Sequence, residues 1–402
     1  MRTRVPFVDA CDSTGVKCWN NPHLNFNCQL STNLRCVDYE PCDAGVTMRV
    51  FYPTSTTPST LSALRPANVP HWKYYYGMLV FQFNVQRANA LVRFVVVCAC
   101  RLGWLVMRFI ATINATMNAP LVADDGEKLN VIVFSHGLSG FRTCNANVAC
   151  ELAARGCVVF CVEHRDGSAT ASASSGENRS VQYQLYKPTG GTHESRRVQT
   201  TVRVTETLTC AKCVDDLDSG DLVSRNIWRG GGGHAQGVLD SFNGRLNVDS
   251  KTLCGFSFGG GSSCATTAQA PTVFARCVLL DHWLEYFNDD DILTAACSMP
   301  TLSLLSENWG SSKLAVNNTT MLTANTRTFY KVTINGAKHH DFSDVRAFLG
   351  LARNVIGMVG VVNIHAMHAV VAKITVDFSR NASNVQVSRD DAQHSIGRVI
   401  AQ

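Results

Sequence analysis

The sequence predicts an α/β fold in which a mostly parallel central sheet is flanked by helices. Two observations carry this prediction. First, short apolar runs that are typical of buried parallel strands recur along the chain, at 131–134, 158–162, 277–280, 301–305 and 329–334. Second, the glycine-flanked pentapeptide GFSFG at 255–259 directly follows the apolar residues Leu253 and Cys254, which indicates a tight corner between a strand and a helix.

One large domain accounts for the length of the chain. It has 402 residues, of which 46% are hydrophobic, enough to bury a sizeable core. We place the domain at 46–375, with an insertion at about 176–244 that is poor in apolar periodicity. A cysteine-rich N-terminal extension (1–45) and a C-terminal extension (376–402) flank it. The net charge of +5 is modest and no basic stripe is interleaved with aromatic residues, so we expect no nucleic-acid binding.

The pentapeptide at 255–259 supplies a candidate nucleophile, Ser257. The α/β-hydrolase fold carries its nucleophile at such a corner, where the flanking glycines let the backbone bend and the serine hydroxyl projects into the site. A serine hydroxyl becomes reactive only when a histidine accepts its proton, and that histidine needs a carboxylate to hold its tautomer. The rest of the chain must therefore provide an acid and a base.

Two carboxylates follow predicted strands downstream of this serine. The run 277–280 ends at Asp281, and the run 301–305 is followed by Glu307, the position that most α/β-hydrolases use for the acid. Both lie at carboxyl ends of strands, where open α/β sheets place their chemistry. The spacing alone leaves both carboxylates open as the acid.

The predicted strand 329–334 runs into a loop that contains His339 and His340, and a histidine on this loop is where the base is expected. The order serine, acid, histidine along the chain is the order of the α/β-hydrolase fold.

The oxyanion hole needs two backbone N–H groups, one just after the nucleophile and one from the loop after an earlier strand. Phe258 follows the nucleophile, and Leu138 lies on the loop after the strand 131–134. These two residues are therefore the expected donors. The neighbouring His136 is expected to hold this loop by hydrogen bonding rather than to take part in proton transfer.

Two further segments are interpreted as structural. His164, Arg165 and Asp166 follow the strand 158–162 and are expected to form a network of ion pairs. The glycine run 230–233 follows no strand and lacks the lysine and hydroxyl residues of a phosphate-binding loop, so we interpret it as a surface loop.

Seventeen cysteines do not define a metal site. Cys210 and Cys213 form one C-x-x-C pair, but no second pair stands at zinc-ligand spacing, and most other cysteines lie in apolar runs as small hydrophobic residues. We expect no metal and no other cofactor. The N-terminal cysteines are dense enough for disulfides in an oxidising compartment, but we expect them to be reduced: Cys11, Cys18, Cys28, Cys36 and Cys42.

The N-terminal residues include no apolar segment of the kind found in a secretory signal. We therefore expect a cytoplasmic protein with peripheral attachment to membranes, or a secreted one if the true start lies upstream of Met1. The sequence gives no indication of the oligomeric state.

The segment 87–110 is almost wholly apolar apart from four arginines, which fall within one arc of roughly 120° on a helix of about 100° per residue. A transmembrane span is disfavoured, because the longest uninterrupted apolar stretch is 94–100. Two interpretations remain open, a helix in a membrane interface and a core helix with a solvated arginine edge. The residues concerned are Arg87, Arg93, Arg101 and Arg108, together with Trp104.

Five motifs resemble the platelet-activating factor acetylhydrolase family, and they occur in the order of that family. They are SHGLSGFRT (135–143), ELAARGCVVFCVEHRDGSA (151–169), GFSFGG (255–260), LLDHW (279–283) and GAKHHDFSD (336–344). The resemblance extends over roughly 46–359, and within 176–244 it is recognisable only around 196–214.

The resemblance implies Ser257 as nucleophile, Asp281 rather than Glu307 as the acid, and His339 as the base, with His340 as a bystander. It also favours the membrane-interface interpretation of 87–110, because members of the family carry an apolar helix there and act on lipid at surfaces. Arg93, Arg101, Arg108 and Trp104 then become the candidate interfacial residues.

The function that follows is a calcium-independent serine esterase that hydrolyses a short or oxidised sn-2 acyl ester of a phospholipid. The alternative is a broader carboxylesterase or phospholipase of the same fold. A binding protein derived from a hydrolase would lack a member of the triad, and none is missing from the sequence.

Overall fold

A computed structural model describes most of the chain. The described residues are 34–39, 45–54, 65–117, 121, 126, 128–175, 181–221, 235–287, 299–312, 322, 328–345, 359–382 and 396–401.

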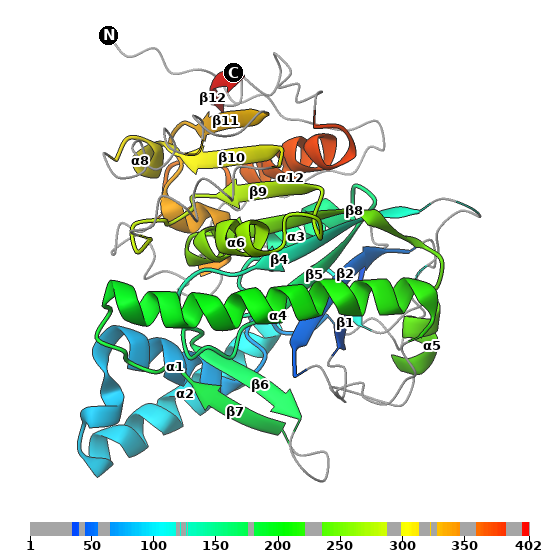
Figure 1. The fold of residues 1–402 in the computed structure, drawn as a ribbon. Coiled ribbons are helices and arrows are strands. Elements are labelled where there is room, and N and C mark those ends of the chain that lie inside the picture. Colours follow the sequence, from blue (N-terminus) through cyan, green and yellow to red (C-terminus); the bar gives the residue numbers. More distant parts are fainter. Residues whose placement is uncertain are drawn as a thin grey trace, which may run out of the picture.

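A ten-stranded sheet runs through the molecule in the order β12-β11-β10-β9-β8-β4-β5-β2-β1-β3 (Figure 1). The six strands from β11 to β5 are parallel, whereas β12 pairs antiparallel with β11, and β2 pairs antiparallel with both β5 and β1. The strands are β1 (Leu34–Tyr39), β2 (Thr47–Pro53), β3 (Thr116–Met117), β4 (Leu129–Ser135), β5 (Cys157–Glu163), β8 (Leu246–Phe256), β9 (Arg276–Leu280), β10 (Thr301–Ser306), β11 (Phe329–Ile334) and β12 (Ile396–Ala401).

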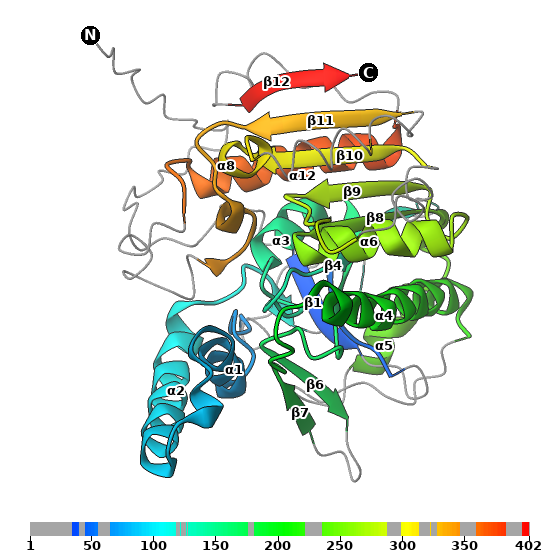
Figure 2. The same cartoon turned by 60° about the vertical axis from the view of Figure 1, so that its left-hand side comes forward.

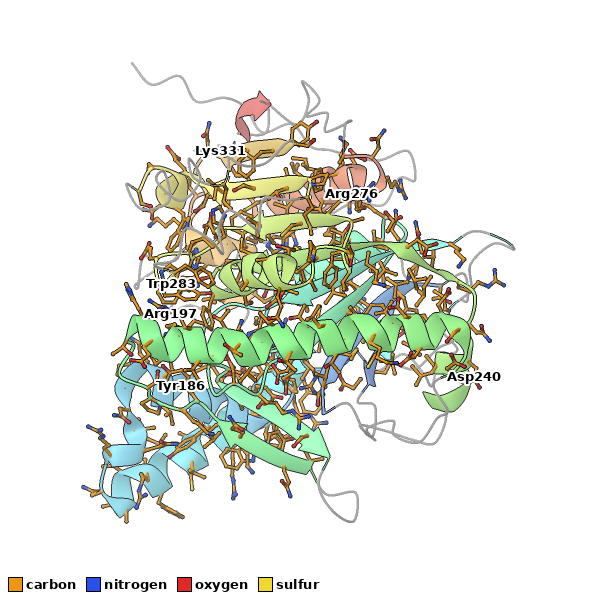
Figure 3. All side chains as sticks on the ribbon, viewed as in Figure 1. Tyr186, Arg197, Asp240, Arg276, Trp283 and Lys331 are labelled. Atoms are coloured by element: carbon orange, nitrogen blue, oxygen red, sulfur yellow. The ribbon has the colours of Figure 1, made fainter. Side chains whose placement is uncertain are left out.

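Helices cover both faces of this sheet. Helices α4 and α6 lie on one face and α3 and α12 on the other, and side chains fill the space between the sheet and the helices (Figures 1 and 3). The helices are α1 (Trp72–Phe83), α2 (Ala90–Ile110), α3 (Ala146–Ala153), α4 (His193–Ser219), α5 (Ala235–Asp240), α6 (Phe258–Gln269), α8 (Glu307–Gly310), α12 (Ile364–Arg380) and the short turns η1 (Val85–Arg87) and η3 (His339–Phe342).

Each face of the sheet has its own apolar core. Val131 and Val133 of β4 point into the core beneath α4 and α6, while Ile132 and Phe134 point into the core beneath α3 and α12. The continuous apolar run in the sequence thus reflects a strand that is buried on both faces. The predicted α/β-hydrolase fold is confirmed, and all five predicted apolar runs lie within strands.

The structure differs from the domain boundaries expected at 45 and 375. Strand β1 lies within the expected N-terminal extension, yet it joins the main sheet, where the buried Asp38 accepts hydrogen bonds from Arg49 of β2. Helix α12 crosses the second boundary, and β12 adds a strand beyond it. The described segments 34–39 and 396–401 of the two extensions therefore pair with the main sheet, because strand pairing satisfies backbone groups that the sequence pattern does not reveal.

Helices α1 and α2 form a hairpin that projects from the body, on the side toward which the carboxyl ends of the parallel strands point (Figures 1 and 2). The two ends of this hairpin lie together, because Ala67 and Thr112 form a β-bridge and the Asn68 N–H donates to the Ala111 carbonyl (2.9 Å). Helix α2 starts three residues after Arg87, which lies in η1, so Arg87 is not part of the predicted helix.

Helix α1 attaches the hairpin to the body. The hydroxyl of Tyr74 donates to Glu163 of β5 (2.6 Å) and accepts from Arg142 (2.7 Å), and all three side chains are buried. Gly77 allows the helix to lie directly on the chain near Thr170, since a Cβ at this position would be 1.7 Å from the Thr170 carbonyl oxygen. By contrast, Cys100 is the only buried residue of α2.

The expected insertion at 176–244 contains the long helix α4. Thr192 caps its first turn by accepting from the Ser195 N–H, and Gly220 ends it in the left-handed conformation. A hairpin of β6 (Ala171–Ser175) and β7 (Val181–Leu185) precedes this helix. The glycine run 230–233 lies outside the described residues.

Candidate active site

Ser257 occupies the corner between β8 and α6 with φ 54° and ψ −117°, a conformation that side-chain-bearing residues rarely adopt. The neighbouring glycines make this corner feasible. A Cβ at Gly255 would lie 2.3 Å from the Gly259 carbonyl oxygen, and one at Gly259 would lie 2.1 Å from the Ser135 carbonyl oxygen. Both positions therefore require glycine, and the spacing of the pentapeptide has a steric cause.

A line of hydrogen bonds joins Ser257, His339 and Asp281. The Nε2 atom of His339 lies 3.0 Å from the Ser257 hydroxyl, and Nδ1 of the same ring lies 3.1 Å from a carboxylate oxygen of Asp281. Because an ionised carboxylate can only accept a hydrogen bond, Nδ1 of His339 carries the hydrogen. In the neutral ring Nε2 is then the acceptor that faces the serine. The three residues that the sequence singled out thus have the geometry that general-base activation requires.

Asp281 is fully buried and held from two sides. Its carboxylate accepts from the backbone N–H and the hydroxyl of Ser306, both at 2.6 Å, in addition to His339. The other carboxylate left open by spacing, Glu307, lies elsewhere and accepts from the Gly336 N–H at 2.6 Å. Only Asp281 is therefore within hydrogen-bond distance of the imidazole.

Two aromatic rings enclose the His339 imidazole. Trp309 stacks on it with ring centroids 4.4 Å apart, and Phe256 lies on it at 4.8 Å. His340 meets the same ring edge-on, and burial together with the His339 charge lowers the pKa of His340 to about 4. His340 has no contact with the serine, as expected of a bystander.

The loop after β4 lies against the serine corner. A Cβ at Gly137 would be 3.2 Å from the Ser257 Cβ, so the backbone that carries the Leu138 N–H runs directly past the nucleophile. The Phe258 N–H begins α6 on the other side of the same corner. Neither N–H donates to a backbone carbonyl within the part of the chain that the structure describes. Leu138 and Phe258 therefore stay the predicted oxyanion donors.

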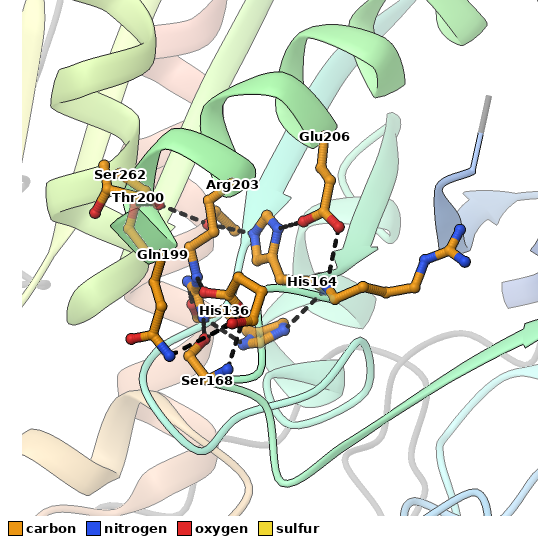
Figure 4. A network of polar contacts seen from close by, with 12 residues as sticks. His136, His164, Ser168, Gln199, Thr200, Arg203, Glu206 and Ser262 are labelled. Atoms are coloured by element: carbon orange, nitrogen blue, oxygen red, sulfur yellow. Dashed lines mark hydrogen bonds and ion pairs between the residues drawn. The ribbon is translucent and has the colours of Figure 1, made fainter. Parts of the chain in front are cut away.

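A buried polar network lies behind this loop and ends on α4 (Figure 4). The His164 ring links the Ser135 hydroxyl (2.8 Å) to the carboxyl group of Glu206 (2.8 Å). The backbone N–H of His164 donates to Nε2 of His136 (3.3 Å). Burial and the charge of Arg203 lower the pKa values of His136 and His164 well below their usual range, so both rings are neutral.

An ion pair of the expected network after β5 is present, and its partner residue comes from α4. Asp166 accepts from Arg203 at 2.9 Å, with both side chains fully buried, and Glu206 accepts from the backbone N–H of Arg165 at 2.9 Å. Burial, reinforced by the charge of Asp166, raises the pKa of Glu206 to about 8.

The cysteines and histidines form no metal site in the described ranges, where no cluster of three or more metal-ligating side chains occurs. Cys210 and Cys213 are buried and free on α4. Cys36 is likewise buried and free on β1, whereas Cys11, Cys18, Cys28 and Cys42 lie outside the described residues.

The candidate interfacial residues divide into two groups. Arg93, Arg101 and Arg108 are exposed on α2, and the guanidinium of Arg108 stacks on Trp104. Trp104 itself is half-buried, because its indole N–H donates to the Val69 carbonyl at 3.1 Å. Trp104 faces the segment before α1, which carries Val69 and His71, and its role as an interfacial residue stays a prediction.

Other side chains form the outer surface of α2. The exposed apolar residues of this helix are Leu91, Val92, Phe94, Val95, Leu102, Leu105, Val106, Phe109 and Ile110. Among the described helices, α2 alone has the length and apolar composition that would allow it to cross a membrane, which differs from the expectation, drawn from its longest uninterrupted apolar stretch, that a span is disfavoured.

The fold and the site together define a serine ester hydrolase of the α/β-hydrolase class. The family model "Platelet-activating factor acetylhydrolase, isoform II" matches residues 28–397, and this chain belongs to that family. The resemblance read from the sequence is thus confirmed, and family and fold together support a hydrolase of lipid esters.

Three curated relatives carry the name platelet-activating factor acetylhydrolase. The Canis lupus familiaris protein is 25% identical over 78% of this chain, the Cavia porcellus protein 28% over 58%, and the Gallus gallus protein 25% over 72%. The chain spans 67%, 52% and 66% of those relatives. Among solved structures, a ferulic acid esterase from Streptomyces cinnamoneus matches with a TM-score of 0.57 and 13% identity, covering 92% of this chain and 95% of its own. This last likeness concerns the fold.

Sequence reasoning missed three residues around the site. Ser306 could have been found, because it ends a strand parallel to β9, and the carboxyl ends of neighbouring parallel strands meet at one edge. No local signal marks Trp309, which reaches the imidazole from α8, or Arg203, which from α4 reaches the loop after β4 that carries Leu138, called the oxyanion loop below.

Proposed function

We propose that this chain is a serine esterase that removes a short or oxidised acyl chain from the sn-2 position of a phospholipid. The observation that carries the proposal is the hydrogen-bonded line of Ser257, His339 and Asp281 beside two unengaged backbone N–H groups, in a member of this family. The reaction proceeds in two steps through an acyl-enzyme.

In the first step the Ser257 hydroxyl attacks the ester carbonyl while Nε2 of His339 takes its proton. The carbonyl oxygen becomes an oxyanion, which the N–H groups of Leu138 and Phe258 stabilise. The C–O bond to the glycerol backbone then breaks, and the imidazolium gives its proton to the departing lysophospholipid.

In the second step water attacks the acyl-enzyme, and His339 takes the proton of the water as it did that of the serine. The second oxyanion forms in the same hole, and its collapse releases the carboxylate and returns the proton to Ser257. Asp281 holds the imidazole and stabilises its charged form in both steps, while Ser306 keeps the Asp281 carboxylate in place.

The acyl-chain preference is drawn from the family and not from the shape of the site. A broader carboxylesterase or phospholipase with the same residues remains the alternative proposal. The two differ in the ratio of kcat/KM for a phospholipid with a short sn-2 chain to that for a soluble short-chain ester. We expect hydrolysis by either route to be insensitive to calcium and to chelators, because base and oxyanion donors come from the chain itself.

We further propose that the enzyme docks peripherally on a phospholipid surface through α2. Support comes from the exposed apolar residues of α2, from the arginines along its edge, and from its location at the end of the molecule where the strands carry the site (Figure 2). In this arrangement the apolar residues enter the acyl boundary and the arginines meet anionic headgroups, each arginine contributing on the order of 1 kcal/mol.

Labelling with a fluorophosphonate tests the catalytic proposal. The wild type should lose activity as one equivalent is incorporated at Ser257, identified by peptide mass, and Ser257→Ala should neither be labelled nor hydrolyse an ester. Ser262→Ala is the matched control, because this buried serine lies on the same helix and contacts Ser135 but not the imidazole. Stoichiometric labelling at another residue, or persistent turnover by Ser257→Ala, would overturn the proposal.

A further inference from the structure

Arg203 is a fully buried arginine whose side chain ends beside the oxyanion loop (Figure 4). From α4, its Nη1 donates to the His136 carbonyl at 2.5 Å, and its Nη2 lies 3.4 Å from the Gly137 carbonyl oxygen and 3.5 Å from Nδ1 of His136. The same Nη2 donates to the Ser168 hydroxyl at 2.7 Å, and Nε donates to Asp166 at 2.9 Å. Every nitrogen of the guanidinium therefore has a partner.

The Gly137 carbonyl belongs to the peptide group whose N–H is that of Leu138. Because a trans peptide is planar, its C=O and N–H point in opposite directions, and fixing one fixes the other. Three donors converge on this oxygen: Nδ1 of His136 at 2.8 Å, the Gly140 N–H at 3.1 Å and Arg203 at 3.4 Å. A rotation of this peptide would remove the Leu138 N–H from the hole and would break all three contacts.

Arg203 also contacts the residue that carries the second donor. Its guanidinium carbon lies 4.4 Å from the centroid of the Phe258 ring, which is completely buried. The Phe258 N–H is the first of α6, so the orientation of this residue sets the direction of the donor. One side chain thus contacts both halves of the oxyanion hole.

We propose that Arg203 is a positioning residue that holds the Leu138 and Phe258 N–H groups in the geometry that binds the oxyanion. The inference rests on the proposed function of Ser257 as nucleophile. It assigns to α4, far from the serine in sequence, a part in stabilising the transition state. Lysine cannot replace the guanidinium in this role, because a single ammonium cannot supply a planar fork to several acceptors and also stack on a ring.

A trifluoromethyl ketone that resembles the acyl group tests this inference. Its carbonyl carbon bonds to the Ser257 oxygen, the serine proton passes to His339, and the former carbonyl oxygen becomes an anion in the hole. The corresponding secondary alcohol fills the same site but forms no bond and no anion. The ratio of the two inhibition constants therefore reports the strength of the hole separately from the integrity of the pocket.

We expect Arg203→Lys to lower kcat for a soluble ester by on the order of 100-fold, with KM little changed. The inhibition constant of the ketone should rise by a similar factor, while that of the alcohol stays within about threefold. The fraction of sites that a fluorophosphonate finally labels should equal that of the wild type, which separates a weakened hole from a misfolded fraction.

Arg196→Lys is the matched control. Arg196 is also a buried arginine of α4 and also faces the Phe258 ring, at 5.9 Å, but its Nη1 donates to Gln199 rather than to the oxyanion loop. All parameters of this variant should stay within about threefold of the wild type. Equal weakening of ketone and alcohol by Arg203→Lys, or an unchanged kcat per labelled site, would overturn the inference.

Arg203→Lys leaves Asp166 buried beside a shorter cation, and this change can prevent folding. A second variant then tests the inference. Arg203→Gln combined with Asp166→Asn removes both charges together and should show the same selective loss of ketone binding. A wild type that is neither labelled nor inhibited by the ketone would overturn the proposed function and this inference with it. An active wild type with an unaltered ratio in both variants would overturn the inference alone.

Discussion

The carboxylate of Asp281 is closed to solvent, and its oxygens accept from Ser306 and His339. Its backbone is itself unusual, with φ 40°, just beyond the last residue of β9, and its side chain meets Nδ1 of the imidazole. A residue held this firmly fixes which nitrogen of His339 carries the proton. The role of Asp281 can be tested by changing its hydrogen bonding without changing its size.

Asp281→Asn should lower kcat by about 10⁴, because the amide donates to the ring and imposes the wrong tautomer, while KM changes little. Glu307→Gln is the control, since the amide oxygen of glutamine can still accept from the Gly336 N–H. Steady-state kinetics on a soluble ester measure both. A larger loss in Glu307→Gln than in Asp281→Asn would contradict the assignment of the acid.

Glu206 makes stability depend on pH in a direction opposite to that of a salt-bridged carboxylate. Its pKa is about 8 in the folded chain, against 4.5 as the ordinary value, so between these pH values the folded state binds one proton more than the unfolded state. The free energy of unfolding should therefore fall as pH rises from about 4.5 to about 8, by up to about 1.4 kcal/mol per pH unit.

Glu206→Gln should remove this contribution, because glutamine resembles the protonated acid and does not ionise. Urea unfolding of both chains at pH 5, 6, 7 and 8 gives a difference curve from which other groups cancel, among them Asp344, whose pKa burial raises to about 7. We expect the free energy of unfolding of the variant, relative to that of the wild type, to rise steadily up to about pH 8. A constant difference would show that Glu206 is ionised throughout.

At the scale of elements, the hairpin of α1 and α2 depends on close contact between α1 and the body. Gly77→Ala should destabilise the protein by about 1–3 kcal/mol, because the new methyl group would collide with the Thr170 carbonyl. Gly103→Ala on α2 is the control, since nothing lies within 4 Å of a Cβ there, and it should be neutral or stabilising by up to about 1 kcal/mol. Thermal unfolding of both variants and proteolysis of the hairpin measure the effect, and equal behaviour would contradict the packing described.

The elements divide by how far the sequence predicted them. Buried parallel strands such as β4 can be predicted from the sequence, because burial on both faces leaves a continuous apolar run. Helix α4 has no such apolar pattern, since its polar and charged residues, such as Glu206, face a buried network and not solvent. The composition of α2 shows an apolar helix, but only the position of α1 decides which side of it faces inward.

The candidate site follows the same division. Ser257 and a histidine on the loop after β11 could be predicted because corner geometry and strand order constrain the local sequence, whereas the choice of His339 over His340 came from the family resemblance. The choice between Asp281 and Glu307 needed either a family resemblance or coordinates, because both follow strands that end at the same edge. Arg203 could not be predicted, since its partners on the loop after β4 are backbone carbonyls, which any residue can supply.

At the scale of the whole molecule, helix α2 lies on the side toward which the carboxyl ends of the parallel strands point (Figure 2). Leu102→Glu combined with Phe109→Glu should reduce binding to phosphatidylserine-containing vesicles at least tenfold, because both side chains are largely exposed and would place charges in the acyl boundary. Arg93→Glu combined with Arg101→Glu should also weaken binding and should reduce its dependence on salt. Vesicle sedimentation at several salt concentrations measures both.

Hydrolysis of a soluble ester should persist in these variants, because none of the four residues contacts the triad. Val198→Glu is the control, since Val198 is an equally exposed apolar residue on α4, outside the hairpin. Vesicle binding at the wild-type level in both α2 variants would contradict docking through this helix and would favour the broader soluble carboxylesterase.

The β-bridge between Ala67 and Thr112 has a consequence for how such proteins can diversify. Because the chain leaves the body and returns to it at one point, helix α2 can be lengthened, shortened or exchanged without moving either attachment, whereas α1 must keep its contacts with the body. Under the docking proposed above, the segment that meets the lipid and the residues that cleave the ester lie in separable stretches of chain. A swap of residues 90–110 between relatives would then change the docking surface and leave the triad unaltered.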